Sequence, residues 1–361
     1  MAAHAGRIHL YTTARRLAIL LAALVTAGCA TPPPLIPVEE PPAVAVAPPE
    51  PPVPAAVVVP PSDTSLATNP VETPAAPREF VPMKTGESRH WLAWQERKRN
   101  FLLHVPPGYD GKTPLPLVLV LHARGSSAQA ARMLGFSRKA DTAKFFVVYP
   151  EALGAARAWS AVFDRSRDKP AAEIDDTGYL EALIGTVRQS VNIDPRRIYL
   201  VGQSSGGMMA YQLAGAAAHL VAGVATVGAT IGSRDREGNV VRIDAPSRAV
   251  PVMHVHGALD KTVPFKGGRS ATLPGMDYLG AGETVEFWAA ANRCFGGPRS
   301  NRVGPVLLEI YDDCEAGATV EFVTIVRGGA EWPRTLRTDA ARTPSIVDTI
   351  WDFFAAHPRK S

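Results

Sequence analysis

The chain has 361 residues, of which 46% are hydrophobic and 20% are charged, and its formal net charge at pH 7 is +4. This length is sufficient for a large domain with an ample hydrophobic core. The mild positive charge is not clustered with aromatic side chains, and no nucleic-acid-binding motif is present. The composition therefore argues against nucleic acid as a partner.

The N-terminal segment predicts export. Three arginines precede an apolar run, Leu17 to Val25, which is too short to span a bilayer. The next residues, Thr26-Ala27-Gly28-Cys29, resemble the lipobox of bacterial lipoproteins, although Thr26 stands where leucine is usual. We expect residues 1–28 to be a lipoprotein-type signal peptide and lipidated Cys29 to anchor the protein to the membrane of the bacterial cell envelope. Simple secretion is the alternative.

A proline-rich segment follows. Between Ala30 and Arg78 the chain holds 16 of its 33 prolines, with alanine, valine and threonine between them. Such a composition forms neither a helix nor a strand ladder, so residues 29–78 are predicted to be an extended, disordered stalk. The remaining residues, 79–361, then form the globular domain.

The other two cysteines are Cys294 and Cys314. An even pair in an exported protein favours a disulfide bond, and two unlinked buried thiols are the alternative.

Within the globular domain, short apolar runs alternate with helix-like segments. The predicted strands are Asn100 to Val105, Leu115 to Leu121, Phe145 to Tyr149, Ile198 to Val201, Val221 to Val227, Val252 to His256, Leu307 to Tyr311 and Val320 to Val326. The predicted helices are Ala128 to Lys144 with a break near Gly135, Gly178 to Ser190, the segment after Ser204, Glu283 to Ala291 and Pro344 to Ala356. Strands that are apolar on both faces and alternate with helices predict an α/β fold, with a doubly wound, mainly parallel sheet and helices on both faces.

The rest of the domain is organised around Gly202-Gln203-Ser204-Ser205-Gly206, which fits the pattern G-x-S-x-G. The predicted strand Ile198 to Val201 precedes it, and a helix-compatible run containing Met208, Met209 and Leu213 follows it. A sharp strand-to-helix turn of this kind holds a nucleophilic serine at the carboxyl end of the sheet, near a helix N-terminus. The alternative is a glycine-rich connection without chemistry.

A nucleophilic serine also needs an acid that orients its base. Asp260 is the candidate, because it follows the predicted strand Val252 to His256 on a loop downstream of the strand-to-helix turn at Ser204, which is called the nucleophile elbow. A turn-forming or helix-capping aspartate is the alternative interpretation. His254 and His256 share one face of that strand and could suggest a metal pair. No third ligand is apparent, so we expect core packing or loop bonding instead.

The oxyanion hole should combine the N–H of Ser205 with an N–H from the loop after Leu121. That loop is His122-Ala123-Arg124-Gly125, and Ala123 or Arg124 could supply the second donor. We interpret His122 as a residue that bonds the loop, with a plain strand-end histidine as the alternative.

Residues from about 97 to 357 resemble the secreted esterases that include polyhydroxybutyrate depolymerases, feruloyl esterases and acetyl-xylan esterases. The matching segments are Leu103-His-Val-Pro-Pro-Gly-Tyr109, Leu115-Pro-Leu-Val-Leu-Val-Leu-His122, Val147-Val-Tyr-Pro150, Asp175-Asp-Thr-Gly-Tyr179, Asp194-Pro-Arg-Arg-Ile-Tyr199, the elbow with Gly207-Met-Met-Ala-Tyr211, His256-Gly257 with Asp260 and Val263-Pro264, and Trp332-Pro333. The resemblance implies an α/β-hydrolase fold, a Ser-Asp-His triad with Ser204 as nucleophile and Asp260 as acid, and no metal or cofactor. It also supports the bond between Cys294 and Cys314.

One departure from the family pattern concerns the base. The family places its catalytic histidine in Gly-Gly-His-x-Trp-Pro, and the corresponding stretch here is Gly328-Gly329-Ala330-Glu331-Trp332-Pro333. The expected histidine position is therefore Ala330, which cannot accept a proton. Glu331 is adjacent, but a carboxylate with an ordinary pKa of about 4.3 is a poor base for serine.

Two hypotheses follow. The first is a serine carboxylic ester hydrolase on the cell envelope that acts on a small or polymeric ester. It needs a base, which would be His122 or another histidine brought in by an unusual loop. The second is a catalytically impaired hydrolase fold kept as a binding protein, since Ala330 replaces the histidine.

Overall fold

The computed structural model describes residues 83–161, 163, 174–334 and 345–360, which belong to a compact unit spanning Glu72–Ser361. The predicted signal peptide (1–28) with its lipidation site Cys29, and the predicted stalk (29–78), lie outside the described residues.

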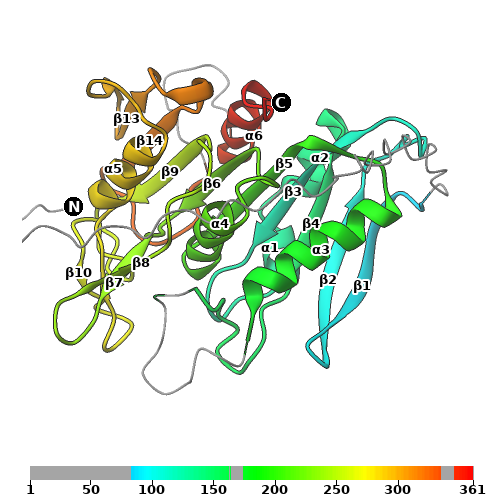
Figure 1. Cartoon of the computed structure of the whole chain (residues 1–361), viewed down its shortest axis with the longest axis horizontal. Coiled ribbons are helices and arrows are strands. Elements are labelled where there is room, and N and C mark those ends of the chain that lie inside the picture. The colour runs from blue at the N-terminus through cyan, green and yellow to red at the C-terminus, as the bar shows by residue number, and fades with distance from the viewer. Residues whose placement is uncertain (1–82, 162, 164–173, 335–344, 361) are drawn as a thin grey trace, which may run out of the picture. The chain divides into compact units, whose positions relative to one another are not determined.

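The described elements form two sheets and a set of helices (Figure 1). The main sheet contains β1 (Gly86–Trp94), β2 (Arg97–Val105), β3 (Leu115–Leu121), β4 (Phe146–Pro150), β5 (Ile193–Gln203), β6 (Gly223–Val227), β9 (Val252–Gly257), β12 (Arg299–Val303), β13 (Val306–Tyr311) and β14 (Val320–Ile325). The small sheet contains β7 (Gly232–Arg234), β8 (Val240–Arg242), β10 (Gly268–Arg269) and β11 (Asp277–Tyr278). The helices are α1 (Ala128–Arg132), α2 (Phe136–Ala143), α3 (Asp176–Ser190), α4 (Ser205–Ala216), α5 (Ala281–Ala291), α6 (Ile346–Ala356) and a short 3₁₀ turn, Glu315–Gly317.

The strand order of the main sheet is β1-β2-β4-β3-β5-β6-β9-β14-β13-β12. All neighbouring pairs from β4 to β14 are parallel. The pairs at both edges are antiparallel. The α/β fold with a mainly parallel sheet is confirmed, although the antiparallel hairpins at its two edges were not predicted.

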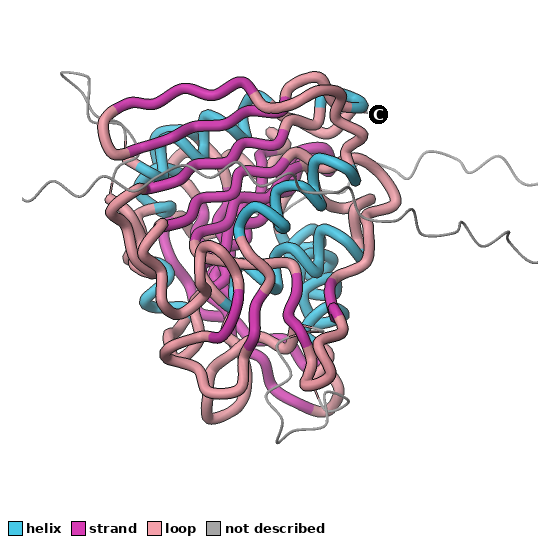
Figure 2. The backbone as a smooth tube through the Cα atoms, turned by 90° about the vertical axis from the view of Figure 1, so that its left-hand side faces the viewer, coloured by secondary structure: helices cyan, strands magenta, loops and turns pink. Residues whose placement is uncertain are grey.

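Side chains on successive residues of the central strands point to opposite faces of the sheet, and both faces are buried. In β3, Leu117, Leu119 and Leu121 belong to a buried cluster that includes residues of α3, α4 and α5, whereas Val118 and Val120 belong to a second cluster that includes residues of α1, α2 and α6. Figure 2 shows the helices on both sides of the strands. This explains why the strand is apolar at every position: neither face meets water.

Most predicted helices and central strands are present, and the expected break near Gly135 separates α1 from α2. Gly135 has a positive φ of 106° and ends one helical segment before the next begins. The strands β1 and β12 were missed. Their burial patterns are half-exposed or almost fully exposed, so they lack the continuous apolar signal of the central strands.

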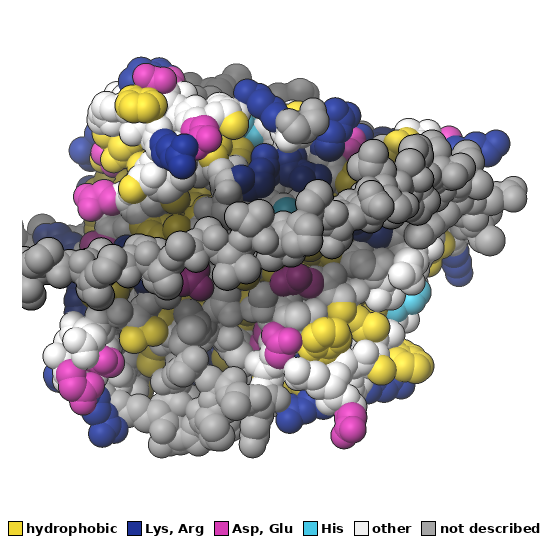
Figure 3. Space-filling model, viewed as in Figure 1, with side chains coloured by type: hydrophobic (Ala, Val, Ile, Leu, Met, Phe, Trp, Pro, Cys, Tyr) yellow, Lys and Arg dark blue, Asp and Glu magenta, His cyan; other side chains and the backbone are white. Residues whose placement is uncertain are grey.

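The disulfide predicted between Cys294 and Cys314 is present. It links the segment after α5 to the turn between β13 and β14. On the face shown in Figure 3, lysine and arginine side chains occur in several separate places among acidic and apolar ones. Among the described helices, none combines the length and apolar character needed to cross a membrane.

Candidate active site

Ser204 lies at the junction of β5 and α4 with φ 52° and ψ −123°, a positive φ that is uncommon for a residue with a side chain. The glycines on either side make this turn possible. A Cβ at Gly202 would overlap the carbonyl of Gly206, and a Cβ at Gly206 would overlap the carbonyl oxygen of Leu121 at the end of β3. The Ser204 N–H donates to the carbonyl oxygen of Val227 at 2.9 Å. The sharp strand-to-helix turn predicted from G-x-S-x-G is therefore confirmed.

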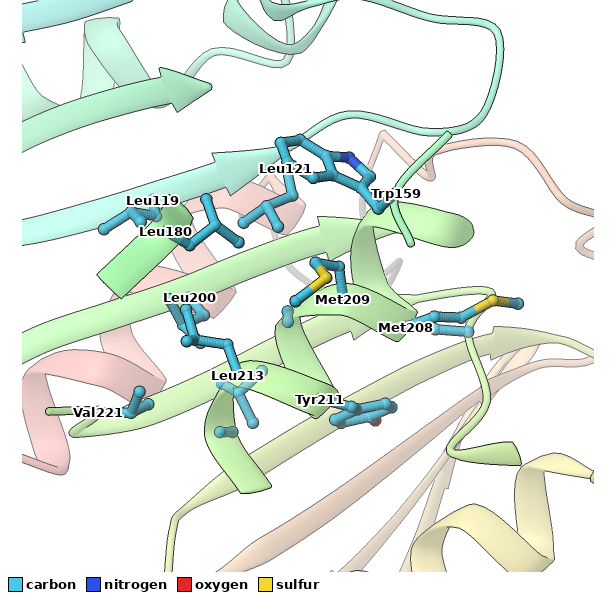
Figure 4. Close-up of a cluster of buried hydrophobic side chains, with 14 of the residues drawn as sticks. Leu119, Leu121, Trp159, Leu180, Leu200, Met208, Met209, Tyr211, Leu213 and Val221 are labelled. Atoms are coloured by element: carbon cyan, nitrogen blue, oxygen red, sulfur yellow. The ribbon is translucent and has the colours of Figure 1, made fainter. Parts of the chain in front are cut away.

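The first turns of α4 are held by packing as well as by the elbow. Met208, Met209 and Leu213 are buried, and Figure 4 shows them in the cluster that also contains Leu121 and Trp159. Because the helix start is packed in the core, the backbone at Ser204 is kept in its strained conformation.

Asp260 follows β9 on a loop, where the sequence placed it, and only 6% of it is exposed. Its Oδ1 accepts hydrogen bonds from the N–H groups of Thr262 at 2.7 Å and Val263 at 3.0 Å. Its Oδ2 lies 3.6 Å from Nε2 of His256. Two backbone donors to one oxygen fix the carboxylate in a single orientation.

Gly228 brings the Ser204 and Asp260 segments close together. It directly follows Val227, the residue that accepts the Ser204 N–H, and it has a positive φ of 58°. A Cβ on Gly228 would lie 3.1 Å from Oδ2 of Asp260. The sequence analysis missed this residue. The sequence feature that could have identified Gly228 is its position directly after β6, the strand between β5 and β9.

Ala330 lies beside both of these segments. Its carbonyl oxygen accepts a hydrogen bond of 3.0 Å from Nε2 of Gln203, the residue before Ser204. The neighbouring carbonyl of Gly328 accepts the N–H of Leu259, the residue before Asp260, at 2.9 Å. The structure thus brings the position expected to hold the base next to the elbow and to the Asp260 loop. Gln203, which makes this link, was not identified from the sequence.

Glu331 does not compensate for Ala330. It is exposed, and its Oε1 accepts the N–H of Gly329 at 3.1 Å. This hydrogen bond lowers the pKa of the Glu331 carboxyl group. A lower pKa makes the carboxylate a weaker base than an ordinary glutamate.

His122 bonds the loop after β3, as the sequence analysis predicted. The Ala123 carbonyl can only accept, so His122 donates its Nδ1–H at 2.8 Å, and Nε2 then accepts the Ala152 N–H at 3.0 Å. Burial lowers the pKa of the imidazole. Since both ring nitrogens are occupied within the fold, the hypothesis that His122 acts as the base is wrong.

His254 and His256 belong to a buried hydrogen-bond chain. Nε2 of His256 donates to the carbonyl oxygen of Val263 at 2.9 Å, so its Nδ1 accepts from Nε2 of His254 at 3.0 Å. Nδ1 of His254 in turn accepts the hydroxyl of Tyr211 at 2.7 Å, and that hydroxyl accepts the hydroxyl of Thr226. Burial lowers the pKa of both imidazoles. Loop bonding is confirmed, and no ring nitrogen remains for a metal.

The other described histidines lie elsewhere. His90 bonds Ser88, His104 bonds Asp141 and His357 bonds Thr319, while His219 is exposed after α4. All seven histidines after residue 82 are described, and none of them hydrogen-bonds Ser204. Among the described residues no cluster of three or more His, Cys, Asp or Glu side chains could hold a metal ion.

The expected oxyanion donors lie on adjacent segments. Ser205 is the first residue of α4, and the first N–H groups of a helix have no partner within it. The close approach of Gly206 to the carbonyls of Leu121 and His122 sets the helix start against the loop that contains Ala123. Backbone donors at this edge can stabilise a negatively charged oxygen.

Several known proteins with sequences similar to this chain are named as esterases. The family described as Phospholipase/Carboxylesterase matches residues 111–274. NocK of Nocardia uniformis subsp. tsuyamanensis, which carries the name of an esterase, is 30% identical over 265 residues, covering 66% of this chain and 71% of NocK. Feruloyl esterase B of Piromyces equi is 25% identical over 236 residues, covering 64% of this chain but only 42% of the relative.

Among solved structures, an acetyl xylan esterase from Aspergillus awamori superposes with a TM-score of 0.50 at 11% identity. The match covers 74% of this chain and 99% of that structure. This likeness supports the fold, and it confirms the α/β-hydrolase architecture that the motif resemblance implied.

Proposed function

This chain belongs to the esterase family of the α/β-hydrolases, and we propose that it is a carboxylic ester hydrolase in which Ser204 is the nucleophile and Asp260 the acid. The observation that carries this proposal is the backbone of Ser204, held at φ 52° and ψ −123° by an elbow without room for side chains at Gly202 or Gly206. Strain of this kind persists where the surrounding structure enforces it, and nucleophile elbows are such places.

The proposed chemistry is acyl transfer. Ser204 Oγ attacks the ester carbonyl carbon, and the N–H groups of Ser205 and Ala123 bind the oxyanion that develops. The Ser204 hydroxyl proton passes to the alcohol oxygen as the alcohol leaves. Water then hydrolyses the acyl-serine and returns a proton to Oγ. Asp260 is fixed by the N–H groups of Thr262 and Val263, so its carboxylate is oriented before substrate arrives.

The residue at position 330 sets the expected rate. Removing one member of a triad costs about 10⁴ to 10⁶ in kcat, and the remaining catalysis comes from binding and the oxyanion hole. Because Ala330 carries no basic group, we expect slow turnover of activated esters.

The test is hydrolysis of p-nitrophenyl acetate and butyrate by the full chain and by Ser204→Ala, with Ser190→Ala as a matched control. Ser190 is an exposed residue at the end of α3. We expect slow p-nitrophenolate release that is lost in Ser204→Ala and kept in Ser190→Ala. Equal release by the wild type and Ser204→Ala would refute the nucleophile assignment.

A second function is favoured by Ala330 itself. A domain that keeps the elbow and the acid but lacks a base can retain an ester-bearing ligand, small or polymeric, without consuming it. In that case the wild type shows no Ser204-dependent release in the same assay but still binds the ester.

The proposed location is the bacterial cell envelope. An exported chain is supported by the signal-like residues before Cys29 and by the disulfide between Cys294 and Cys314, since such bonds persist in oxidising compartments. Anchoring through a lipid on Cys29 would be tested by metabolic labelling with a radioactive fatty acid. Loss of the label in Cys29→Ser would support the anchor, and an unlabelled wild type would contradict it.

A further inference from the structure

The buried carboxylate of Asp260 has one oxygen that no described residue bonds. Oδ1 takes two backbone hydrogen bonds, from Thr262 and Val263, whereas Oδ2 takes none from the described residues. Nε2 of His256 lies 3.6 Å from Oδ2, but it already donates to the Val263 carbonyl at 2.9 Å. Asp260 as a whole is only 6% exposed, so a donor that reached Oδ2 would pair with a carboxylate that is largely shielded from water.

Oδ2 lies close to the segment that accepts the Ser204 N–H. It is next to Gly228, which has no side chain to cover it and whose neighbour Val227 accepts the Ser204 N–H. Ala330 is bonded through its carbonyl to Gln203, and the nearby Gly328 carbonyl accepts the N–H of Leu259, the residue before Asp260. The side chain of Ala330 ends at Cβ. The nucleophile and acid of a serine hydrolase are therefore on neighbouring segments, and none of the described histidines hydrogen-bonds Ser204.

We propose that this position binds a neutral nitrogen base supplied by the ligand, an imidazole or a small amine, between Asp260 Oδ2 and Ser204 Oγ. The inference rests on the proposed function and names its substrate class: esters that carry such a nitrogen, or esters hydrolysed together with a free one.

The step balances without any further reactant. The ligand nitrogen accepts the Ser204 hydroxyl proton while Oγ forms a bond to the ester carbonyl carbon, and the resulting cation pairs with Asp260. When the carbonyl re-forms, the bond to the alcohol oxygen breaks and that oxygen takes the proton from the nitrogen. The neutral nitrogen then removes a proton from the water that attacks the acyl carbon, and it returns that proton to Ser204 Oγ as the bond between Oγ and the acyl group breaks.

The test measures p-nitrophenyl acetate hydrolysis by the full chain over a series of imidazole concentrations. Ser204→Ala provides the background reaction of imidazole with the ester. We expect the Ser204-dependent rate to rise at least about tenfold and to saturate, as at a binding site. A Ser204-dependent rate that is independent of imidazole would overturn the proposal.

Three variants distinguish binding of imidazole at this site from a general effect of imidazole on the reaction rate. Asp260→Asn should lose most of the gain, because it removes the charge that pairs with the protonated nitrogen. Ala330→Val should also lose it by filling the position, and it leaves Asp260 intact if Asp260→Asn folds poorly. Ala330→His should hydrolyse the ester without imidazole and gain nothing from it.

A second arm distinguishes a nitrogen on the substrate from a free one. An acetate ester of an imidazolyl alcohol is compared with the same ester bearing phenyl in place of imidazole, both without added base. Faster Ser204-dependent hydrolysis of the imidazolyl ester assigns the nitrogen to the substrate. Equal rates, with gain from free imidazole, assign it to a separate small molecule.

The esterase assignment and the proposed nitrogen site are refuted by different results. If Ala330→His is active and the wild type gains nothing from imidazole or from an imidazolyl ester, the nitrogen site is refuted and the esterase assignment stands. If Ala330→His is folded, shows no Ser204-dependent activity and is not labelled by a fluorophosphonate, the esterase assignment fails and the nitrogen site fails with it.

Discussion

Nε2 of Gln203 donates a hydrogen bond of 3.0 Å to the carbonyl oxygen of Ala330. The residue before the proposed nucleophile is thereby joined to the residue that stands where a base is expected. Position 330 is held against the elbow by its backbone, so its side chain can change without altering this contact.

Ala330→His is predicted to raise ester turnover. The imidazole would be introduced on a loop that is already bonded to Gln203 and to Leu259, so general base catalysis should be restored at least in part. Positioned acid–base groups contribute about 10²- to 10⁴-fold, and we expect kcat for p-nitrophenyl butyrate to rise within that range. Ala330→Gln is the control, because glutamine has comparable bulk and no basic nitrogen. An equal gain in Ala330→Gln would show that proton transfer is not responsible.

Gly206→Ala is predicted to distort the elbow. The added Cβ would overlap the carbonyl oxygens of Leu121 and His122, which are backbone atoms that cannot move aside. Overpacking of this kind costs about 1–3 kcal/mol, and the labelling rate of Ser204 by a fluorophosphonate should fall as well. The matched control is Gly185→Ala in α3, where a Cβ meets no atom within 4 Å. That helical substitution should be neutral or stabilising by up to about 1 kcal/mol. An unchanged melting temperature and labelling rate in Gly206→Ala would contradict the packing argument.

The sequence predicted the central strands and the elbow because their signals are local. Leu115 to Leu121 is apolar at every position, and the bounds predicted for it are those of β3. The carboxyl ends of parallel strands share one edge of a sheet, so the order of Ser204 and Asp260 along the chain was enough to bring their loops together.

Contacts between loops could not be predicted from local sequence patterns. Gln203 and Gly228 occupy positions that many residue types could fill as far as local structure is concerned, and their roles arise only once the Ala330 and Asp260 loops fold against them. The edge strand β12 was missed because its residues are almost all exposed, so it has no apolar pattern. For His254 and His256, the shared strand face was evident but the partners Tyr211 and Val263 come from other segments.

The buried histidine pair predicts a loss of stability in mild acid. Burial lowers the pKa of His254 and His256 below the ordinary value of 6.5, with Tyr211 facing the first and Asp260 facing the second. Below about pH 6.5 the unfolded chain binds protons that the folded chain does not, so the free energy of unfolding falls as the pH falls, by up to about 1.4 kcal/mol per pH unit for each histidine. Above about pH 6.5 the two histidines are neutral in both states, and the free energy of unfolding no longer depends on their protonation.

Denaturant unfolding between about pH 5.5 and 7.5 measures this slope, in a range above the titration of ordinary carboxylates. His254→Gln keeps an amide donor and acceptor in the buried hydrogen-bond chain but removes one titrating group. The pH dependence of its unfolding free energy should therefore be weaker than that of the wild type. His219→Gln, at an exposed position after α4, should leave the slope unchanged. A slope in His254→Gln equal to that of the wild type would refute the assignment to the buried pair.

The disulfide is predicted to stabilise the domain without affecting the site. Cys294 and Cys314 are 20 residues apart, and closing a loop of that length stabilises by about 3 kcal/mol in the chain-entropy account. The native contacts nearby do not need the bond. Buried Asn292 bonds the backbone of Val250 in both directions and the Ala318 carbonyl, so the end of α5 is fixed independently.

The double variant Cys294→Ser/Cys314→Ser should therefore unfold at lower denaturant concentration, by about 3 kcal/mol, while fluorophosphonate labelling of Ser204 proceeds at the wild-type rate. Adding a reductant should lower the stability of the wild type to that of the double variant and should leave the double variant unchanged, which excludes a general effect of the reductant. A slower labelling rate in the double variant under native conditions would mean that the bond also shapes the elbow. That result would contradict the separation between the two regions, because the contacts of Asn292 would then be insufficient to hold β9 and the Asp260 loop in place.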